Sequence, residues 1–120
     1  MNTAIRIVAC LALLGAFLPG QALAHGLLVQ TAPAADAVVA EPPVEISLSF
    51  NEKIEARFSG LDLVGPDGAA IAIGEIAVID QDMVAPVLVS LLPGVYQVDW
   101  HVLSADGHKV AGSYKFDVKP

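Results

Sequence analysis

The sequence has one cysteine, few basic residues and no apolar run long enough to cross a membrane. Because Cys10 is the only cysteine in 120 residues, the chain has neither an internal disulfide nor a cluster of thiolates for a metal. The 6 Lys and Arg are outnumbered by 13 Asp and Glu, which gives a formal charge of −7. This balance disfavours nucleic acid and anionic membranes as partners, since both are bound through Lys and Arg. The apolar run at residues 7–18 is shorter than the roughly 20 residues of a membrane span.

Residues 1–24 have the pattern of a secretory signal peptide. Arg6 gives the first residues a positive charge, residues 7–18 are apolar, and residues 22–24 read Ala-Leu-Ala, a small-x-small cleavage signal. We therefore expect cleavage after residue 24 and export of a single domain, residues 25–120. The expected location is periplasmic, and we expect no membrane insertion of the mature chain.

Cleavage at this point would remove both Cys10 and Arg6. The mature domain would then have no cysteine. Its 13 acidic residues would outnumber the five Lys and Arg that are left when Arg6 is removed from the 6 of the chain. Processing before Cys10, as in a lipoprotein, would leave the hydrophobic residues 11–18 on the exported chain and does not fit the export signal. Without disulfides, the domain must be stabilised by an ordinary packed core, which a chain of about this length can supply.

Short segments of alternating apolar and polar residues, separated by Pro and Gly, predict β-strands. Inward-facing positions are expected at Leu61 and Leu63, at residues 96, 98, 100 and 102, and at Tyr114, Phe116 and Val118. The predicted strands cover residues 27–31, 44–50, 58–64, 87–91, 94–102 and 112–118, with one or two more between 71 and 79 and a polar connection at 80–83. No segment has a sustained helical period. The pattern predicts an all-β, immunoglobulin-like antiparallel β-sandwich of about seven strands.

The residues that carry chemistry gather at the loop of residues 104–108, which reads Ser-Ala-Asp-Gly-His. The three histidines of the chain are His25, His101 and His108. Each has an ordinary interpretation when taken alone. His101 lies on the polar face of a predicted strand, and Asp-Gly is a common turn dipeptide. An isolated histidine in a loop has no necessary function.

Taken together, His25, Asp106 and His108 predict a copper(II) site. After cleavage His25 would be the first residue, so its amine and its imidazole can chelate one metal. The amine has a reference pKa of about 7.7–8.0, so copper(II) can displace its proton near neutral pH. His108 adds an imidazole and Asp106 a carboxylate. Three nitrogens and one oxygen in a tetragonal arrangement suit copper(II) better than zinc, which prefers a tetrahedron.

The chain resembles the CopC family of periplasmic copper-resistance proteins over nearly all of the expected mature domain. The resemblance rests on the order and spacing of several motifs: His25 after the cleavage signal, residues 31–34, 48–52, 92–100, 104–108 and 112–116. The resemblance implies a seven-stranded Greek-key sandwich with a copper(II) site. It also implies that His25, Asp106 and His108 are the ligands of that site. Glu52 matches an acidic position near the site in some members.

The sequence departs from the family members that also bind copper(I) through a methionine-rich segment. Met83 would be the only methionine left after cleavage, and one thioether cannot build such a site. We therefore expect a single-site copper(II)-binding protein, not an enzyme, that sequesters copper or hands it to a separate inner-membrane copper transporter.

Two other functions remain open from the sequence. An N-terminal histidine with a second histidine also resembles the copper brace of oxidative polysaccharide-cleaving enzymes, although aromatics for a sugar-binding face are few, at 6% of the chain. A metal-free structural or adhesive sandwich domain is the other alternative.

Overall fold

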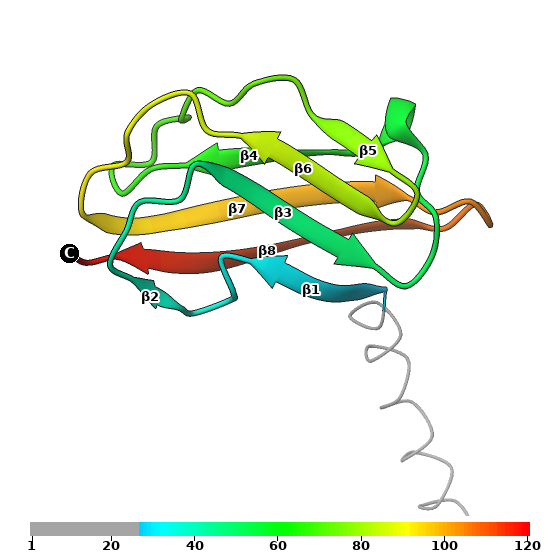
Figure 1. The fold of residues 1–120 in the computed structure, drawn as a ribbon. Helices are drawn as coiled ribbons and strands as arrows, with labels where there is room; N and C mark the ends of the chain where they lie inside the picture. Colours follow the sequence, from blue (N-terminus) through cyan, green and yellow to red (C-terminus); the bar gives the residue numbers. More distant parts are fainter. Residues whose placement is uncertain (1–26) are drawn as a thin grey trace, which may run out of the picture.

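In a computed structural model, residues 27–120 form two β-sheets packed face to face (Figure 1). The expected signal peptide and His25 lie outside these described residues. The elements are β1 (Leu28–Ala32), β2 (Val38–Val39), β3 (Glu45–Phe50), the 3₁₀ turn η2 (Ala56–Phe58), β4 (Gly60–Val64), β5 (Ala77–Ile79), β6 (Asp82–Pro86), β7 (Gly94–Leu103) and β8 (Lys109–Val118). No helix within the described residues is long and apolar enough to span a membrane.

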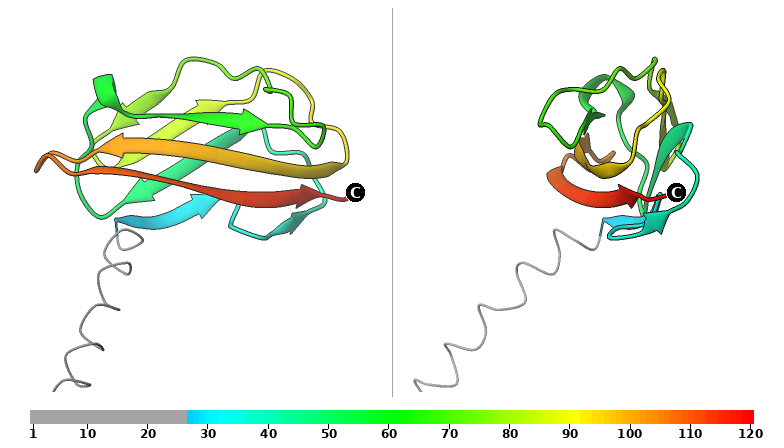
Figure 2. Two further views of the ribbon diagram at one scale, coloured as in Figure 1. Left: turned by 180° about the vertical axis from the view of Figure 1, so that it is seen from behind. Right: turned by 90° about the vertical axis from the view of Figure 1, so that its left-hand side faces the viewer.

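Each sheet contains four strands, and the chain crosses between the sheets several times. One sheet has the order β1-β3-β6-β5 and the other the order β2-β8-β7-β4. All pairings are antiparallel except that of β2 with β8, which is parallel. The two layers are visible edge-on in Figure 2. The predicted β-sandwich is confirmed, with two very short strands, β2 and β5, that bring the number in the described residues to eight.

The core lies between the sheets and is built from alternate residues of the longer strands. On β7 the predicted inward positions 96, 98, 100 and 102 are all buried, as are Leu61 and Leu63 on β4. The rings of Phe50 and Trp100 meet edge to face across the sandwich, with centroids 5.4 Å apart. On β8, Phe116 and Val118 are buried, whereas Tyr114 is only partly buried against the core. Burial of these apolar surfaces is the main favourable contribution to folding.

The strand predicted over residues 58–64 begins later than the alternation suggests. Phe58 belongs to η2, is 58% exposed, and has the guanidinium of Arg57 5.8 Å from its ring centroid. Val44, at the edge of another alternating segment, is likewise exposed. Both side chains precede the first ladder pair of their strands, Gly60 with His101 and Glu45 with Pro86. Apolar character alone therefore did not bring them into the core.

The connection predicted at residues 80–83 is confirmed for residues 80 and 81, which form the β5–β6 turn, but is wrong for residues 82 and 83, and the strand predicted at 87–91 is wrong. The segment expected to be a connection contributes the start of β6, and Met83 is fully buried. Residues 87–91, expected to be a strand, make only one isolated bridge, from Val87 to Ile73. The difference arises because β6 is defined by its pairing with β3, where Ser49 lies opposite Asp82 and Ile46 opposite Ala85. Such long-range pairing overrides a weak local pattern.

Replacing Gly112 with alanine tests the packing at Trp100. A Cβ atom on Gly112 would lie 2.6 Å from Cζ2 and 2.9 Å from Cε2 of this buried indole. We expect Gly112→Ala to lower the free energy of unfolding by about 1–3 kcal/mol, as overpacking does. Gly60→Ala is the matched control, because its nearest neighbour is the exposed ring of His101 at 3.1 Å, which can move aside. Urea denaturation of both variants measures the effect, and equal stability would contradict this packing.

Candidate metal centre

The loop of residues 104–108 closes the long hairpin formed by β7 and β8. The last ladder pair joins Leu103 to Lys109, which leaves five residues to reverse the chain. The N–H of Ser104 donates to the carbonyl of His108 at 2.9 Å, and the N–H of Gly107 donates to the carbonyl of Ser104 at 2.9 Å. Gly107 has φ of +93°, a conformation that glycine adopts without steric cost. The loop is thus held by its own hydrogen bonds.

This tight turn brings Asp106 and His108 into direct contact. Nδ1 of His108 lies 3.0 Å from Oδ1 of Asp106, while the two side chains remain 77% and 48% exposed, respectively. The same Oδ1 accepts a hydrogen bond from the Ser104 hydroxyl. This bond, and to a lesser extent the hydrogen bonds and charge of His108, hold the pKa of Asp106 below its usual value against the opposing effect of desolvation. The carboxylate therefore stays ionised over the whole physiological range.

The donor atoms of this pair fit a small metal ion. Two ligands at right angles, each about 2.0–2.1 Å from a metal, lie about 2.8–3.0 Å apart. The observed separation of Oδ1 and Nδ1, 3.0 Å, falls in that range. The spacing of these two atoms thus matches that of two adjacent ligands of one metal ion. An imidazole and a carboxylate are two donors, however, so a stable site needs further ligands from elsewhere.

The segment of residues 51–55, which leads out of β3, connects this loop to the start of β1. The N–H of Asn51 donates to the carbonyl of Leu27 at 2.8 Å. The N–H of Ala105 donates to the carbonyl of Lys53 at 2.8 Å, and Ile54 forms an isolated bridge with Ser104. The first described residue and the contacting side chains of Asp106 and His108 therefore belong to segments that are both hydrogen-bonded to residues 51–55, at the same end of the sandwich.

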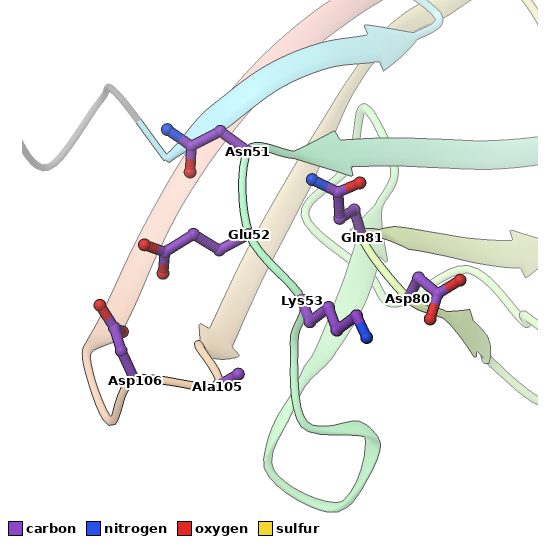
Figure 3. Close-up of a pocket in the computed structure, with 7 residues that line it drawn as sticks. All are labelled: Asn51, Glu52, Lys53, Asp80, Gln81, Ala105 and Asp106. Atoms are coloured by element: carbon purple, nitrogen blue, oxygen red, sulfur yellow. The ribbon is translucent and has the colours of Figure 1, made fainter.

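An open groove of about 480 Å³ lies beside the loop and is lined by Asn51, Glu52, Lys53, Asp80, Gln81, Ala105 and Asp106. In Figure 3 the carboxylates of Glu52 and Asp106 point to one side of the segment, and the side chains of Lys53 and Asp80 point to the other. The side nearer the loop is therefore negatively charged, which favours the approach of a cation.

The structure brings together two of the three residues predicted as ligands, Asp106 and His108. His25, the third, lies outside the described residues. Within residues 27–120, no group of three or more His, Cys, Asp or Glu side chains is arranged to hold a metal ion. His101 is exposed on β7 opposite Gly60, in agreement with its predicted position on the polar face. The described residues alone thus give a partial site.

Ser104 is a residue of the site that the sequence patterns did not single out. Its side chain is buried, and its hydroxyl contacts both members of the pair. The signal available in the sequence was a short hydroxyl residue two positions before an aspartate, an arrangement typical of local side-chain hydrogen bonds in turns.

Comparison with known proteins assigns the family. The family model described as the CopC domain matches residues 28–119. The chain belongs to the CopC family. Among CopC relatives, Protein YobA of Escherichia coli K12 is 43% identical over 99 residues, which cover 80% of this chain and 80% of YobA. The crystal structure of PcoC, a methionine-rich copper resistance protein from Escherichia coli, superposes with a TM-score of 0.67 at 31% identity and covers 78% of this chain and 97% of PcoC.

A CopC-like region also occurs inside a much longer protein. The copper transport protein CutJ of Bacillus subtilis is 26% identical over 105 residues, which are 85% of this chain and only 19% of CutJ. The relatives of this chain thus include proteins that it matches over most of their length and one that it matches over a minor part.

The pKa of Asp106 provides a test of the loop geometry in the metal-free protein. We expect a value below the usual one of about 3.9, and His108→Ala should raise it only in part because the Ser104 bond is the larger cause. Since the folded-state pKa is lowered, this group's contribution to stability is present above the usual pKa and is lost as the pH falls through the lowered value. Carbon-13 NMR titration of the Asp106 carboxyl measures it, and a value at or above the usual one would contradict the geometry.

Proposed function

We propose that this CopC-family protein is exported to the periplasm and binds one copper(II) ion through His25, Asp106 and His108. Its function is to sequester copper or to deliver it in copper homeostasis. The observation that carries the proposal is the contact between Asp106 and His108. Their loop and the start of β1 are both hydrogen-bonded to the segment of residues 51–55. The copper resistance function of PcoC, a protein of the same fold and family, supports the choice of metal.

The reach of the chain supports the participation of His25. Leu27 is hydrogen-bonded to Asn51, and Asn51 lines the same groove as Asp106. His25 lies two positions before Leu27, and two residues of extended chain span about 7 Å. A mature N-terminus at His25 would therefore begin within reach of the groove, where its amine and imidazole complete the ligands supplied by Asp106 and His108.

The donor set favours copper in its divalent state. Nitrogen and carboxylate ligands suit copper(II), whereas copper(I) prefers the sulfur of methionine and cysteine. After the proposed cleavage the only thioether belongs to Met83, whose side chain is fully buried in the core. A methionine-rich copper(I) site is therefore not part of the proposal.

Delivery of copper requires an acceptor, and we propose a separate inner-membrane copper transporter. The basis is the match to CutJ, in which a CopC-like region accounts for only 19% of a copper transport protein. In CutJ the CopC-like region and the rest of a copper transport protein share one chain. Here they would be separate proteins, and the exposed position of Asp106 and His108 at one tip of the sandwich leaves the metal accessible to an acceptor.

Substitution of the proposed ligands should abolish tight binding. Protein purified from the periplasm after expression of the full chain should bind one copper(II) ion. Asp106→Ala and His108→Ala should each weaken binding by at least about 100-fold, since even residues that only orient ligands account for 10- to 100-fold. His101→Ala is the matched control, because it removes an exposed histidine outside the loop. Affinity is measured by competition with a copper(II) chelator, and unchanged binding by His108→Ala would remove that residue from the site.

The free amine of His25 should be essential for affinity. Before cleavage this nitrogen is an amide, which offers copper no readily available lone pair. A variant that carries one added serine before His25 should fold normally, bind copper(II) much more weakly and show fewer nitrogen ligands by electron paramagnetic resonance. Mass spectrometry verifies each N-terminus and circular dichroism verifies equal folding. Equal affinity with and without the extra residue would exclude the N-terminal chelate while leaving the Asp106–His108 pair in place.

A further inference from the structure

Ser104 is the one polar residue within residues 27–120 whose side chain is buried, with 1% of its surface exposed. It sits at the base of the loop, where β7 ends and Ile54 bridges to it from the neighbouring segment. A buried hydroxyl carries a cost unless it is hydrogen-bonded. Its partners therefore explain why a serine occupies a position that would otherwise suit alanine.

The hydroxyl of Ser104 is bonded on both sides to the residues of the proposed site. It accepts a hydrogen bond from the N–H of His108 at 3.1 Å and donates to Oδ1 of Asp106. The carbonyl of His108, 3.3 Å away, is the alternative acceptor for its single proton. That carbonyl already accepts the N–H of Ser104 at 2.9 Å. The charged carboxylate is therefore the stronger acceptor for the hydroxyl.

We propose that Ser104 is a positioning residue. Its hydroxyl fixes the side-chain orientation of Asp106 for metal binding before the metal binds. This inference rests on the proposed copper site. Without the hydroxyl, the half-exposed carboxylate of Asp106 keeps only the side-chain contact with the 77% exposed imidazole of His108. Copper would then have to order both side chains on binding, and the cost of that ordering appears as lost affinity.

Ser104→Ala should weaken copper(II) binding by about 10- to 100-fold, the usual effect of removing a group that orients a metal ligand. Ser59→Ala is the matched control. The Ser59 hydroxyl accepts a hydrogen bond from the N–H of Leu103 at 3.2 Å, so its loss also removes one partly buried bond near the end of β7 but leaves Asp106 untouched. Ser59→Ala should bind copper with unchanged affinity and an unchanged electron paramagnetic resonance spectrum. Equal losses in both variants would reduce Ser104 to a general structural role and overturn the proposal.

A double-mutant cycle distinguishes an effect that passes through Asp106 from a general disturbance of the loop. In an Asp106→Ala background, Ser104→Ala should cause no further loss of copper affinity, because the side chain that it positions is absent. A disturbance that displaced His108 would persist in that background. Additive losses in the double variant would therefore overturn the proposal.

The metal-free protein gives a readout that does not depend on copper. In the wild-type protein, NMR scalar couplings of Asp106 should report a single side-chain rotamer, and the Ser104 hydroxyl proton should be protected from exchange with water. Ser104→Ala should show averaged couplings at Asp106, and Ser104→Thr, which keeps the hydroxyl, should restore the single rotamer. Averaged couplings in the wild-type protein would overturn the role of Ser104 even if copper binds. A single rotamer in a protein that binds no copper would instead reject the proposed function and retain the positioning of Asp106.

Discussion

The antiparallel ladder between β7 and β8 is the constraint on which the rest of the structure depends. It joins ten residues of each strand, from Gly94 opposite Val118 to Leu103 opposite Lys109. The ladder aligns the buried faces of both strands, so Tyr96 stacks on Phe116 at a centroid distance of 5.6 Å. Its register also decides where the hairpin ends, and therefore which five residues form the loop. A shift of one residue would turn the buried side chains outward and displace Asp106 and His108 from their contact.

Residues 51–55 add a second constraint by joining the two sheets at this end. Their backbone bonds reach Leu27 before β1, Leu103 at the end of β7 and Ala105 in the loop. Ile54, which is buried, also donates its N–H to the carbonyl of Asp80 in the β5–β6 turn at 3.0 Å. The loop that carries the exposed pair Asp106 and His108 is thus hydrogen-bonded to a segment that contacts both sheets.

Local sequence was a reliable guide where polar and apolar residues alternate over a long segment. The inward positions of β3, β4 and β7 follow from that alternation, because a strand with one buried face repeats every two residues. The alternation did not predict strand β6. In that strand only Met83 and Ala85 are buried, and Asp82 and Pro86 flank them. Such a segment becomes a strand because β3 and β5 lie on either side of it. Pairing partners tens of residues away are not visible in a short window of sequence.

For the site, the residue types alone identified a carboxylate and an imidazole, two positions apart at an Asp-Gly turn, as donors suited to a metal. The resemblance to the CopC family, now established by the family match, agreed with that choice. Tertiary structure decided the remaining features: the burial of Ser104 beneath the loop and the joining of the loop to the start of β1 through residues 51–55. The physical reason is that donor chemistry belongs to individual side chains, whereas burial and backbone pairing arise only when distant segments pack together.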